Sequence, residues 1–134
     1  MTELVVDASV VLKWFGPSAE RRSAEARRLR ADYEAGRLVA VVPRLLFLEL
    51  LNVAGRRWRW PEAALLELGR SLAELGLEVR EPDLDSIARW VARGLTAYDA
   101  AYVALAEEGG LRLVTDDDRI LQVAGKIATP LAGF

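Results

Sequence analysis

Short apolar segments alternate with longer helix-like segments along this chain, and this alternation limits its fold more than any other feature. The clearest of these segments, residues 4–6 and 38–42, contain no polar residue, which indicates strands that are covered on both faces. We expect strands at residues 4–6, 38–42, 77–80, 111–114 and 126–128. Helices are expected between them, at residues 8–15, 19–35, 43–58, 61–76, 83–93, 97–108 and 115–124. This order predicts an α/β fold, a single α/β/α sandwich with a mostly parallel sheet of roughly five strands and right-handed crossovers.

The length and composition fit one domain that spans residues 1–134. A chain of 134 residues with 52% hydrophobic side chains can bury a core of its own. The sequence starts without the basic and apolar segments of a signal peptide, and its longest strongly apolar stretch, residues 45–53, is too short to span a bilayer. We therefore expect a cytoplasmic protein with no membrane partner.

The chain contains no cysteine and no histidine. The absence of cysteine excludes disulfides, thiol catalysis and thiolate zinc sites. The absence of histidine excludes Ser-His-Asp chemistry and imidazole bases. A reaction carried out by this protein must therefore use carboxylates, hydroxyls, arginine, lysine or a metal.

The net charge of −2 conceals a difference between the two halves of the chain. Residues 1–60 carry 11 basic and 7 acidic side chains, whereas residues 61–134 carry 7 basic and 13 acidic ones. Most of the basic residues are arginines, and they gather in two clusters: Arg21, Arg22, Arg27, Arg28 and Arg30, and then Arg56, Arg57 and Arg59. Arginine clusters suit contact with phosphates, although solvated helix faces have the same pattern.

Acidic residues follow several of the expected strands, where ligands bind in open parallel sheets. Asp7 comes directly after the first strand, Asp99 lies in the first turn of the helix at 97–108, and three aspartates occupy residues 116–118. Helix capping is an alternative explanation for each of them. Asp7 could be an N-cap, and Thr96 with Asp99 or Thr115 with Asp118 could form capping boxes.

Glu49 is harder to explain by structure alone, because leucines and a phenylalanine surround it in the sequence. The pattern predicts a helix that is apolar nearly all round and therefore buried. An ionised carboxylate in such a helix must be paired, protonated or metal-bound. The alternatives are a salt bridge to an arginine, or a side chain that reaches an exposed end of the helix.

Together, these acids indicate a site for a hard divalent cation. Mg²⁺ takes oxygen ligands, typically one or two carboxylates, and retains several waters. A metal-activated water is the natural nucleophile in a protein that lacks histidine, and a metal can also neutralise and orient a phosphodiester. The residue types therefore point to metal-assisted phosphodiester hydrolysis.

The chain resembles the PIN-domain ribonucleases, and in particular the VapC toxins of bacterial and archaeal toxin–antitoxin pairs. The resemblance covers essentially the whole chain and is carried by four segments in order: residues 5–15 (VVDASVVLKWF), 42–43 with 49–53 (VP and ELLNV), 95–106 (LTAYDAAYVALA) and 113–117 (LVTDD). It implies a catalytic and metal-binding set made of Asp7, Glu49, Asp99 and Asp117, with Mg²⁺ or Mn²⁺ held above all by Asp7 and Asp99.

The family pattern at the fourth acid is Thr, any residue, Asp, which matches Thr115 and Asp117. Here Asp116 and Asp118 flank that position, so they compete with Asp117 for the role. Ser9, Thr96 and Thr115 are expected to orient the carboxylates or water, or to act as plain caps.

The resemblance further implies an RNA substrate, a homodimer and a cognate antitoxin whose tail would cover the acidic site. Trp58 and Trp60, next to the second arginine cluster, suggest an interface, where tryptophan and arginine are enriched, or packing in the core.

Three other classes of protein compete with this hypothesis. A phosphoacceptor receiver domain would need an acidic pair after the first strand, and a haloacid-dehalogenase-type phosphatase would need Asp-x-Asp there. The sequence has Asp7-Ala8-Ser9 at that point. A non-catalytic PIN-like domain that binds only a protein partner would not need all four acids.

Overall fold

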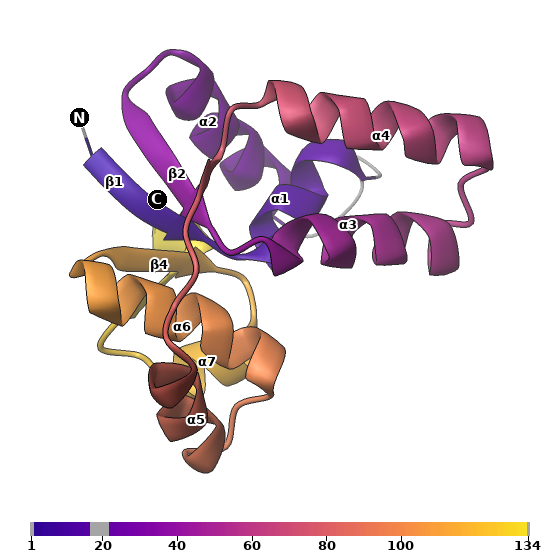
Figure 1. The fold of residues 1–134 in the computed structure, drawn as a ribbon. Coiled ribbons are helices and arrows are strands. Elements are labelled where there is room, and N and C mark those ends of the chain that lie inside the picture. The colour runs from indigo at the N-terminus through magenta and orange to yellow at the C-terminus, as the bar shows by residue number, and fades with distance from the viewer. Residues whose placement is uncertain (1, 17–21, 134) are drawn as a thin grey trace.

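The computed structural model describes residues 2–16 and 22–133 and contains one five-stranded sheet (Figure 1). All neighbouring strands pair in parallel, which confirms the parallel sheet expected from the uninterrupted apolar segments. In sheet order, the strands are β3 (Glu78–Val79), β2 (Leu38–Val42), β1 (Thr2–Val6), β4 (Arg112–Thr115) and β5 (Ala128–Pro130).

Seven α-helices and one short 3-10 helix are found among the described residues. They are α1 (Ala8–Phe15), α2 (Ser23–Glu34), α3 (Leu45–Arg56), α4 (Glu62–Glu74), α5 (Leu84–Ala92), α6 (Ala97–Gly109), α7 (Asp118–Val123) and the 3-10 helix η1 (Leu131–Gly133). None of the helices in the described part of the chain is both long enough and apolar enough to cross a membrane.

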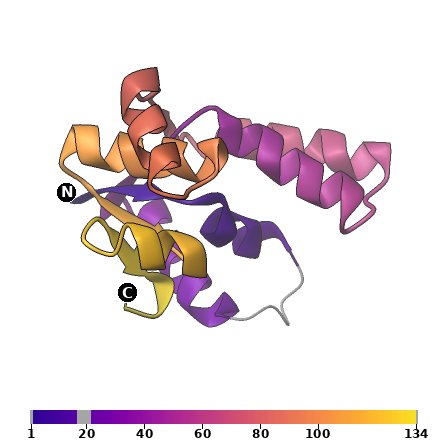
Figure 2. The ribbon, with the colours of Figure 1, turned by 90° about the horizontal axis from the view of Figure 1, so that it is seen from below.

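The sheet lies between two helical layers, as Figure 2 shows. Helices α5 and α6 pack against each other, and α6 covers β1 and β4 on one face, while α2 covers β2 on the other. The three central strands carry side chains that are fully or almost fully buried, such as Val5, Val41 and Leu113. This double coverage explains why these strands are apolar without alternation.

The order of the strands reverses between β1 and β4. The chain moves outwards from β1 to β2 and β3, then returns to the other side of β1 to form β4 and β5. A crevice forms at such a reversal, beyond the carboxyl ends of the strands, and ligands bind there. Receiver domains have the order 2-1-3-4-5 instead, so the order 3-2-1-4-5 contradicts the receiver alternative.

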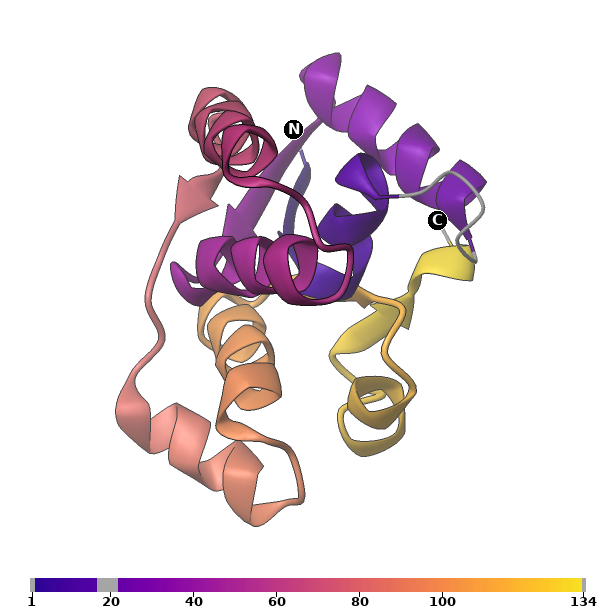
Figure 3. The same cartoon turned by 90° about the vertical axis from the view of Figure 1, so that its right-hand side faces the viewer.

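Helices α3 and α4 lie side by side and project beyond the carboxyl edge of the sheet (Figures 1 and 3). Only three residues of α3 are buried, namely Leu46, Leu50 and Ala54, while Leu48 is 69% exposed. The prediction that this helix is buried all round was therefore wrong. The reason is that residues four apart form one core-facing stripe, while other apolar side chains face α4 or solvent.

The boundaries of several elements differ from the predictions. The last strand was expected at residues 126–128 and is found at Ala128–Pro130. The backbone N–H groups of Ile127 and Ala128 both donate to Ala124 O, so the chain completes a turn before the strand can begin. The helix expected from residue 19 is found from Ser23, and residues 19–21 lie outside the described part of the chain.

Candidate active site

Asp7 directly follows β1 at the point where the strand order reverses. Its side chain is 4% exposed, and its backbone N–H donates to Val114 O of β4 (3.1 Å). Asp7 occupies the N-cap position of α1, but its side chain accepts no capping hydrogen bond. Instead, Asp7 Oδ2 accepts hydrogen bonds from Ser9 Oγ (2.7 Å) and Thr115 Oγ1 (2.7 Å). The capping explanation of this carboxylate is therefore wrong, and two hydroxyls orient it.

The same two hydroxyls connect α1 with the loop that follows β4. Ser9 Oγ accepts a hydrogen bond from Asp116 N (3.0 Å), and Thr115 Oγ1 accepts one from Asp117 N (3.0 Å). Each hydroxyl thus donates to Asp7 and accepts from the loop backbone. As a result, the loop after β4 has a fixed position relative to a carboxylate from the start of the chain.

Helix α6 brings Asp99 to the same edge of the sheet. Thr96 caps this helix, and its Oγ1 accepts a hydrogen bond from Asp99 N (3.1 Å), as the capping alternative expected. The carboxylate of Asp99 is half-buried in the first turn. The capping hydrogen bond comes from the backbone N–H of Asp99, and the Thr96 side chain also interacts with the Asp99 carboxylate, which opposes the rise in its pKa.

Helix α3 contributes Glu49, which is held by a tyrosine from α6. Tyr102 Oη donates to Glu49 Oε1 (2.7 Å), and the tyrosine is fully buried. Tyr102 follows Asp99 by three residues and so lies on the same helix face. In the described structure, the partner of Glu49 is this buried hydroxyl and not an arginine. Glu49 is also half-buried, so its side chain does not reach an exposed end of the helix.

Pairwise electrostatic interactions connect the four predicted acids. Burial raises the pKa of Asp7 above its usual range, and the charge of Asp117 raises it further. Burial also raises the pKa of Glu49 to about 7, with added repulsion from Asp7 and Asp99. The pKa of Asp99 is raised to about 6 by burial, then by the charges of Asp117 and Asp7. The carboxylates are therefore close enough to disfavour one another's ionisation.

The three consecutive aspartates after β4 have different surroundings. Asp116 forms ion pairs with Lys13 Nζ (3.3 Å) and Arg22 Nε (3.2 Å), and its side chain is 10% exposed. Asp117 caps α7 by accepting a hydrogen bond from Ile120 N at its Oδ1 (2.9 Å), so the cap is Asp117 and not Thr115. Of the three, only Asp117 raises the pKa of Asp7 and Asp99, which favours it as the fourth acid.

Sequence reasoning missed three residues that shape this site. Tyr102 could have been found from its spacing of three from Asp99 in a helix. Lys13 and Arg22 both form ion pairs with Asp116. No local pattern predicts their pairing, because it depends on how α1 and the start of α2 are placed against the loop after β4.

The donor set fits a hard divalent cation. Carboxylate and hydroxyl oxygens are the ligands that Mg²⁺ and Mn²⁺ prefer, and the mutual repulsion of the acids is what a cation would offset. Within residues 2–16 and 22–133, no three acidic side chains converge as a ready set of direct ligands. Mg²⁺ does not require three direct carboxylate ligands, because it binds through one or two and retains several waters.

The chain belongs to the PIN domain family. The family model described as PIN domain matches residues 4–126, which is most of the chain. The sequence is also 35% identical to Ribonuclease VapC3 from Pyrobaculum aerophilum over 139 aligned residues, which cover 96% of this chain and 99% of that protein. These matches confirm the resemblance inferred from the four sequence segments.

Solved structures give the same picture of the fold. PAE2754 from Pyrobaculum aerophilum has a TM-score of 0.69 and 27% identity, over 98% of this chain and 92% of that one. VapC20 from Mycobacterium tuberculosis, titled a sarcin-ricin loop cleaving toxin, has a TM-score of 0.68 over 91% of this chain and 95% of that one. At 19% identity, the second similarity supports the fold alone.

Proposed function

We propose that this chain is an endoribonuclease that depends on Mg²⁺ or Mn²⁺ and acts as the toxin of a type II toxin–antitoxin pair in the cytoplasm. Asp7, Glu49, Asp99 and Asp117 are the catalytic and metal-binding residues in this proposal. One observation carries it: the acids come from four separate parts of the fold at the reversal of the strand order. Burial raises the pKa of Asp7, Glu49 and Asp99, and the charges of neighbouring acids raise it further.

When bound, the cation would lower the pKa of a water so that it can attack a phosphodiester, and would neutralise charge on the phosphate. Asp7 and Asp99 would hold it above all, as the similarity to the PIN-domain ribonucleases implies. The hydroxyls of Ser9 and Thr115 keep the Asp7 carboxylate in one orientation. The Tyr102 hydroxyl donates a hydrogen bond to Glu49 Oε1 and so keeps the Glu49 carboxylate in one orientation. These supports reduce the movement of the carboxylates during the reaction.

The similarity to Ribonuclease VapC3 over nearly the whole chain supports RNA as the substrate and a VapC-type toxin role. It also supports a cognate antitoxin as a partner, and we extend the proposal to a homodimer on the same basis. The alternative of a non-catalytic PIN-like binding module is disfavoured by the acids themselves. A binding surface has no need for carboxylates that are desolvated and repel one another.

The test is digestion of single-stranded RNA labelled at one end, with Mg²⁺, Mn²⁺ or EDTA. We expect internal cuts with either cation and none with EDTA. Asp99→Asn should reduce cleavage by at least about 100-fold while its circular dichroism spectrum stays unchanged. The matched control is Asp85→Asn, which alters an exposed aspartate in the first turn of α5.

Cleavage that persists in EDTA would overturn the metal dependence. Cleavage by Asp99→Asn at the rate of the unaltered protein would overturn the site assignment. Release of single nucleotides from one end, without internal cuts, would make the enzyme an exonuclease. Loss of cleavage in both Asp99→Asn and Asp85→Asn would indicate that the acids act through folding alone.

A further inference from the structure

The end of α3 and the turn that follows it present three arginines to solvent. Arg56 closes α3, and Arg57 and Arg59 lie in the turn that leads to α4. All three are exposed. In the described structure, none of them takes part in an ion pair or a side-chain hydrogen bond. This group, named here the α3 tip, is therefore a patch of positive charge without acidic partners.

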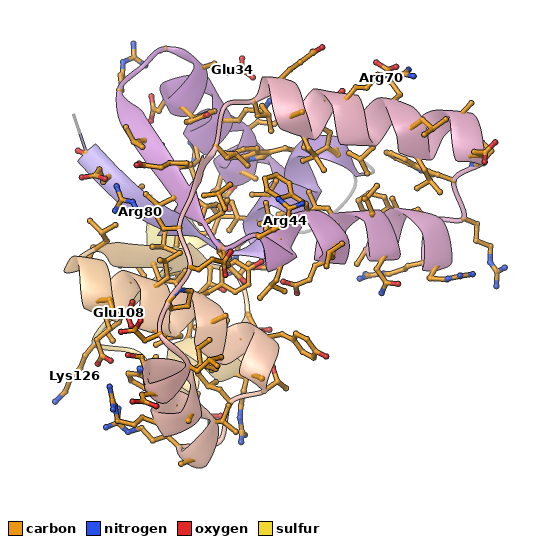
Figure 4. All side chains as sticks on the ribbon, in the orientation of Figure 1. Glu34, Arg44, Arg70, Arg80, Glu108 and Lys126 are labelled. Atoms are coloured by element: carbon orange, nitrogen blue, oxygen red, sulfur yellow. The ribbon has the colours of Figure 1, made fainter. Side chains whose placement is uncertain are left out.

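Several other arginines of the chain do have acidic partners. Arg80 pairs with Glu3 and Glu78, and Arg70 pairs with Glu67; both arginines are labelled in Figure 4. Arg37 and Arg30 similarly pair with acidic residues of α2. The α3 tip thus differs from these four arginines, each of which has a carboxylate beside it.

The α3 tip lies on the same side of its helix as the acidic site. Glu49 and Arg56 are seven residues apart, which is almost two full helical turns, so their side chains leave the same face. Asn52 lies between them on that face and is exposed. At about 1.5 Å per residue, Arg56 is about 10 Å further along the axis than Glu49. A strand of RNA that enters the site could follow this face outwards.

The turn is built to hold these arginines in place. The backbone N–H of Trp60 donates to Ala54 O (3.0 Å), and Arg59 has a φ of 57°. Glycine is the residue favoured at such a left-handed position. An arginine there occupies a strained backbone conformation, which is a mark of functional residues.

Two tryptophans fix the turn on the rest of the fold. The rings of Trp58 and Trp60 contact each other with centroids 5.3 Å apart, and both pack against the core. The indole of Trp58 also lies against Gly16 at the end of α1, where a Cβ atom would be 2.6 Å from the ring. Trp58 and Trp60 therefore attach the turn to the core, while the arginines between and beside them are exposed to solvent.

We propose that the α3 tip, with Asn52, binds the phosphates of single-stranded RNA next to the acidic site. This inference rests on the proposed function, because it assigns the surface that holds the substrate of the same site. Guanidinium groups bind phosphate in a bidentate manner, and an unpaired cluster of them complements the charge of RNA. The negative charge of the four acids repels the RNA backbone, and a nearby positive surface would favour its approach.

The test measures RNA binding in a variant that we expect not to cleave the RNA. The probe is a fluorescent single-stranded RNA oligonucleotide, and its affinity for the Asp99→Asn protein is measured by anisotropy over a range of salt concentrations. The test variant adds Arg56→Gln and Arg59→Asn, since asparagine tolerates the left-handed conformation. The control adds Arg37→Gln and Arg70→Gln, which remove the same charge elsewhere.

We expect the test variant to bind at least tenfold more weakly and to lower the slope of log affinity against log salt by about 1.4, which corresponds to two lost phosphate contacts. The control should keep the slope. Cationic groups at a helix end also stabilise the helix dipole, so thermal melting is recorded for both. If the test variant melts early, Arg56→Lys with Arg59→Lys serves instead, and it should retain the slope.

An unchanged slope and affinity in the folded test variant would overturn the inference. An equal loss in the control would do the same, because it would show a general effect of charge. The proposed function has a separate readout, namely cleavage by the unaltered protein with Mn²⁺. If the unaltered protein cleaves RNA but the test variant keeps the same salt slope and affinity, the α3 tip does not bind the RNA. The proposed ribonuclease function would then still stand.

Discussion

Replacing Glu49 with glutamine should stabilise the metal-free protein at alkaline pH. The substitution keeps the shape of the side chain and an oxygen that can accept the hydrogen bond from Tyr102. It removes one negative charge from a half-buried position beside Asp7 and Asp99. The variant therefore isolates the energetic cost of gathering the carboxylates.

The magnitude follows from the pKa of Glu49, which burial and neighbouring charge raise from 4.5 to about 7. That difference corresponds to about 3 kcal/mol at full ionisation. Solvent reaches part of this side chain and screens the charge, so we expect about 1–2 kcal/mol. The folded protein holds the Glu49 proton more tightly than the unfolded chain. The stabilisation from this proton is therefore complete below pH 4.5 and is lost as the pH rises to about 7.

Urea denaturation with EDTA present measures the effect. The free energy of unfolding of Glu49→Gln should exceed that of the unaltered protein by about 1–2 kcal/mol at pH 8.5, and by less than half of that at pH 5. Saturating Mg²⁺ should raise the melting temperature of the unaltered protein more than that of the variant. The control is Glu74→Gln, at an exposed position in α4, where we expect a change within about 0.5 kcal/mol at both pH values.

Two results would refute this reasoning. If Glu49→Gln is less stable than the unaltered protein at pH 8.5 without metal, the carboxylate is favourable where it lies and the cluster is not repulsive. If the gain is the same at pH 5 and pH 8.5, it does not come from ionisation. In the second case, improved packing or hydrogen bonding of the amide would be the cause.

Three further substitutions test other contacts of the site, each by chemical denaturation. Tyr102→Phe should cost about 1–3 kcal/mol at pH 8.5, since it removes a hydrogen bond to a carboxylate, and the loss should be smaller at pH 5, where Glu49 is protonated; equal losses would contradict this. Asp116→Asn should cost about 1–3 kcal/mol, because Lys13 and Arg22 lose a shared carboxylate; a change under 0.5 kcal/mol would show that these pairs are too solvated to matter. Gly16→Ala should destabilise by about 1–3 kcal/mol, as its Cβ would overlap the indole of Trp58, and a neutral outcome would mean that the ring moves aside freely.

The sequence predicted the sheet well because its information is local. An uninterrupted apolar strand such as residues 38–42 can only be covered on both faces, and the position of Asp7 after a strand places it at the carboxyl edge. The last strand was misplaced because the turn at Ala124 was not visible in the pattern of apolar residues.

The limits of the sequence are clearest at the site. Thr96 was identified as a cap because capping depends on residues three apart. The surroundings of Glu49 were misjudged, because apolar neighbours in the sequence do not reveal that α3 projects from the sheet and exposes Leu48. The choice between Asp116 and Asp117 likewise depends on residues of α1 and α2, which lie about 100 positions away in the chain.

The hydrogen bond between Thr115 and Asp7 joins residues separated by 108 positions, and the bond between Tyr102 and Glu49 spans 53. A cation at this site would act as a reversible cross-link between distant parts of the chain. Such links stabilise by restricting the unfolded chain, and the effect grows with the length of the loop they close. Loading with metal should therefore slow hydrogen exchange in α3, α6 and the loop after β4 together. Local opening of any one of them would release the ion and stop the enzyme.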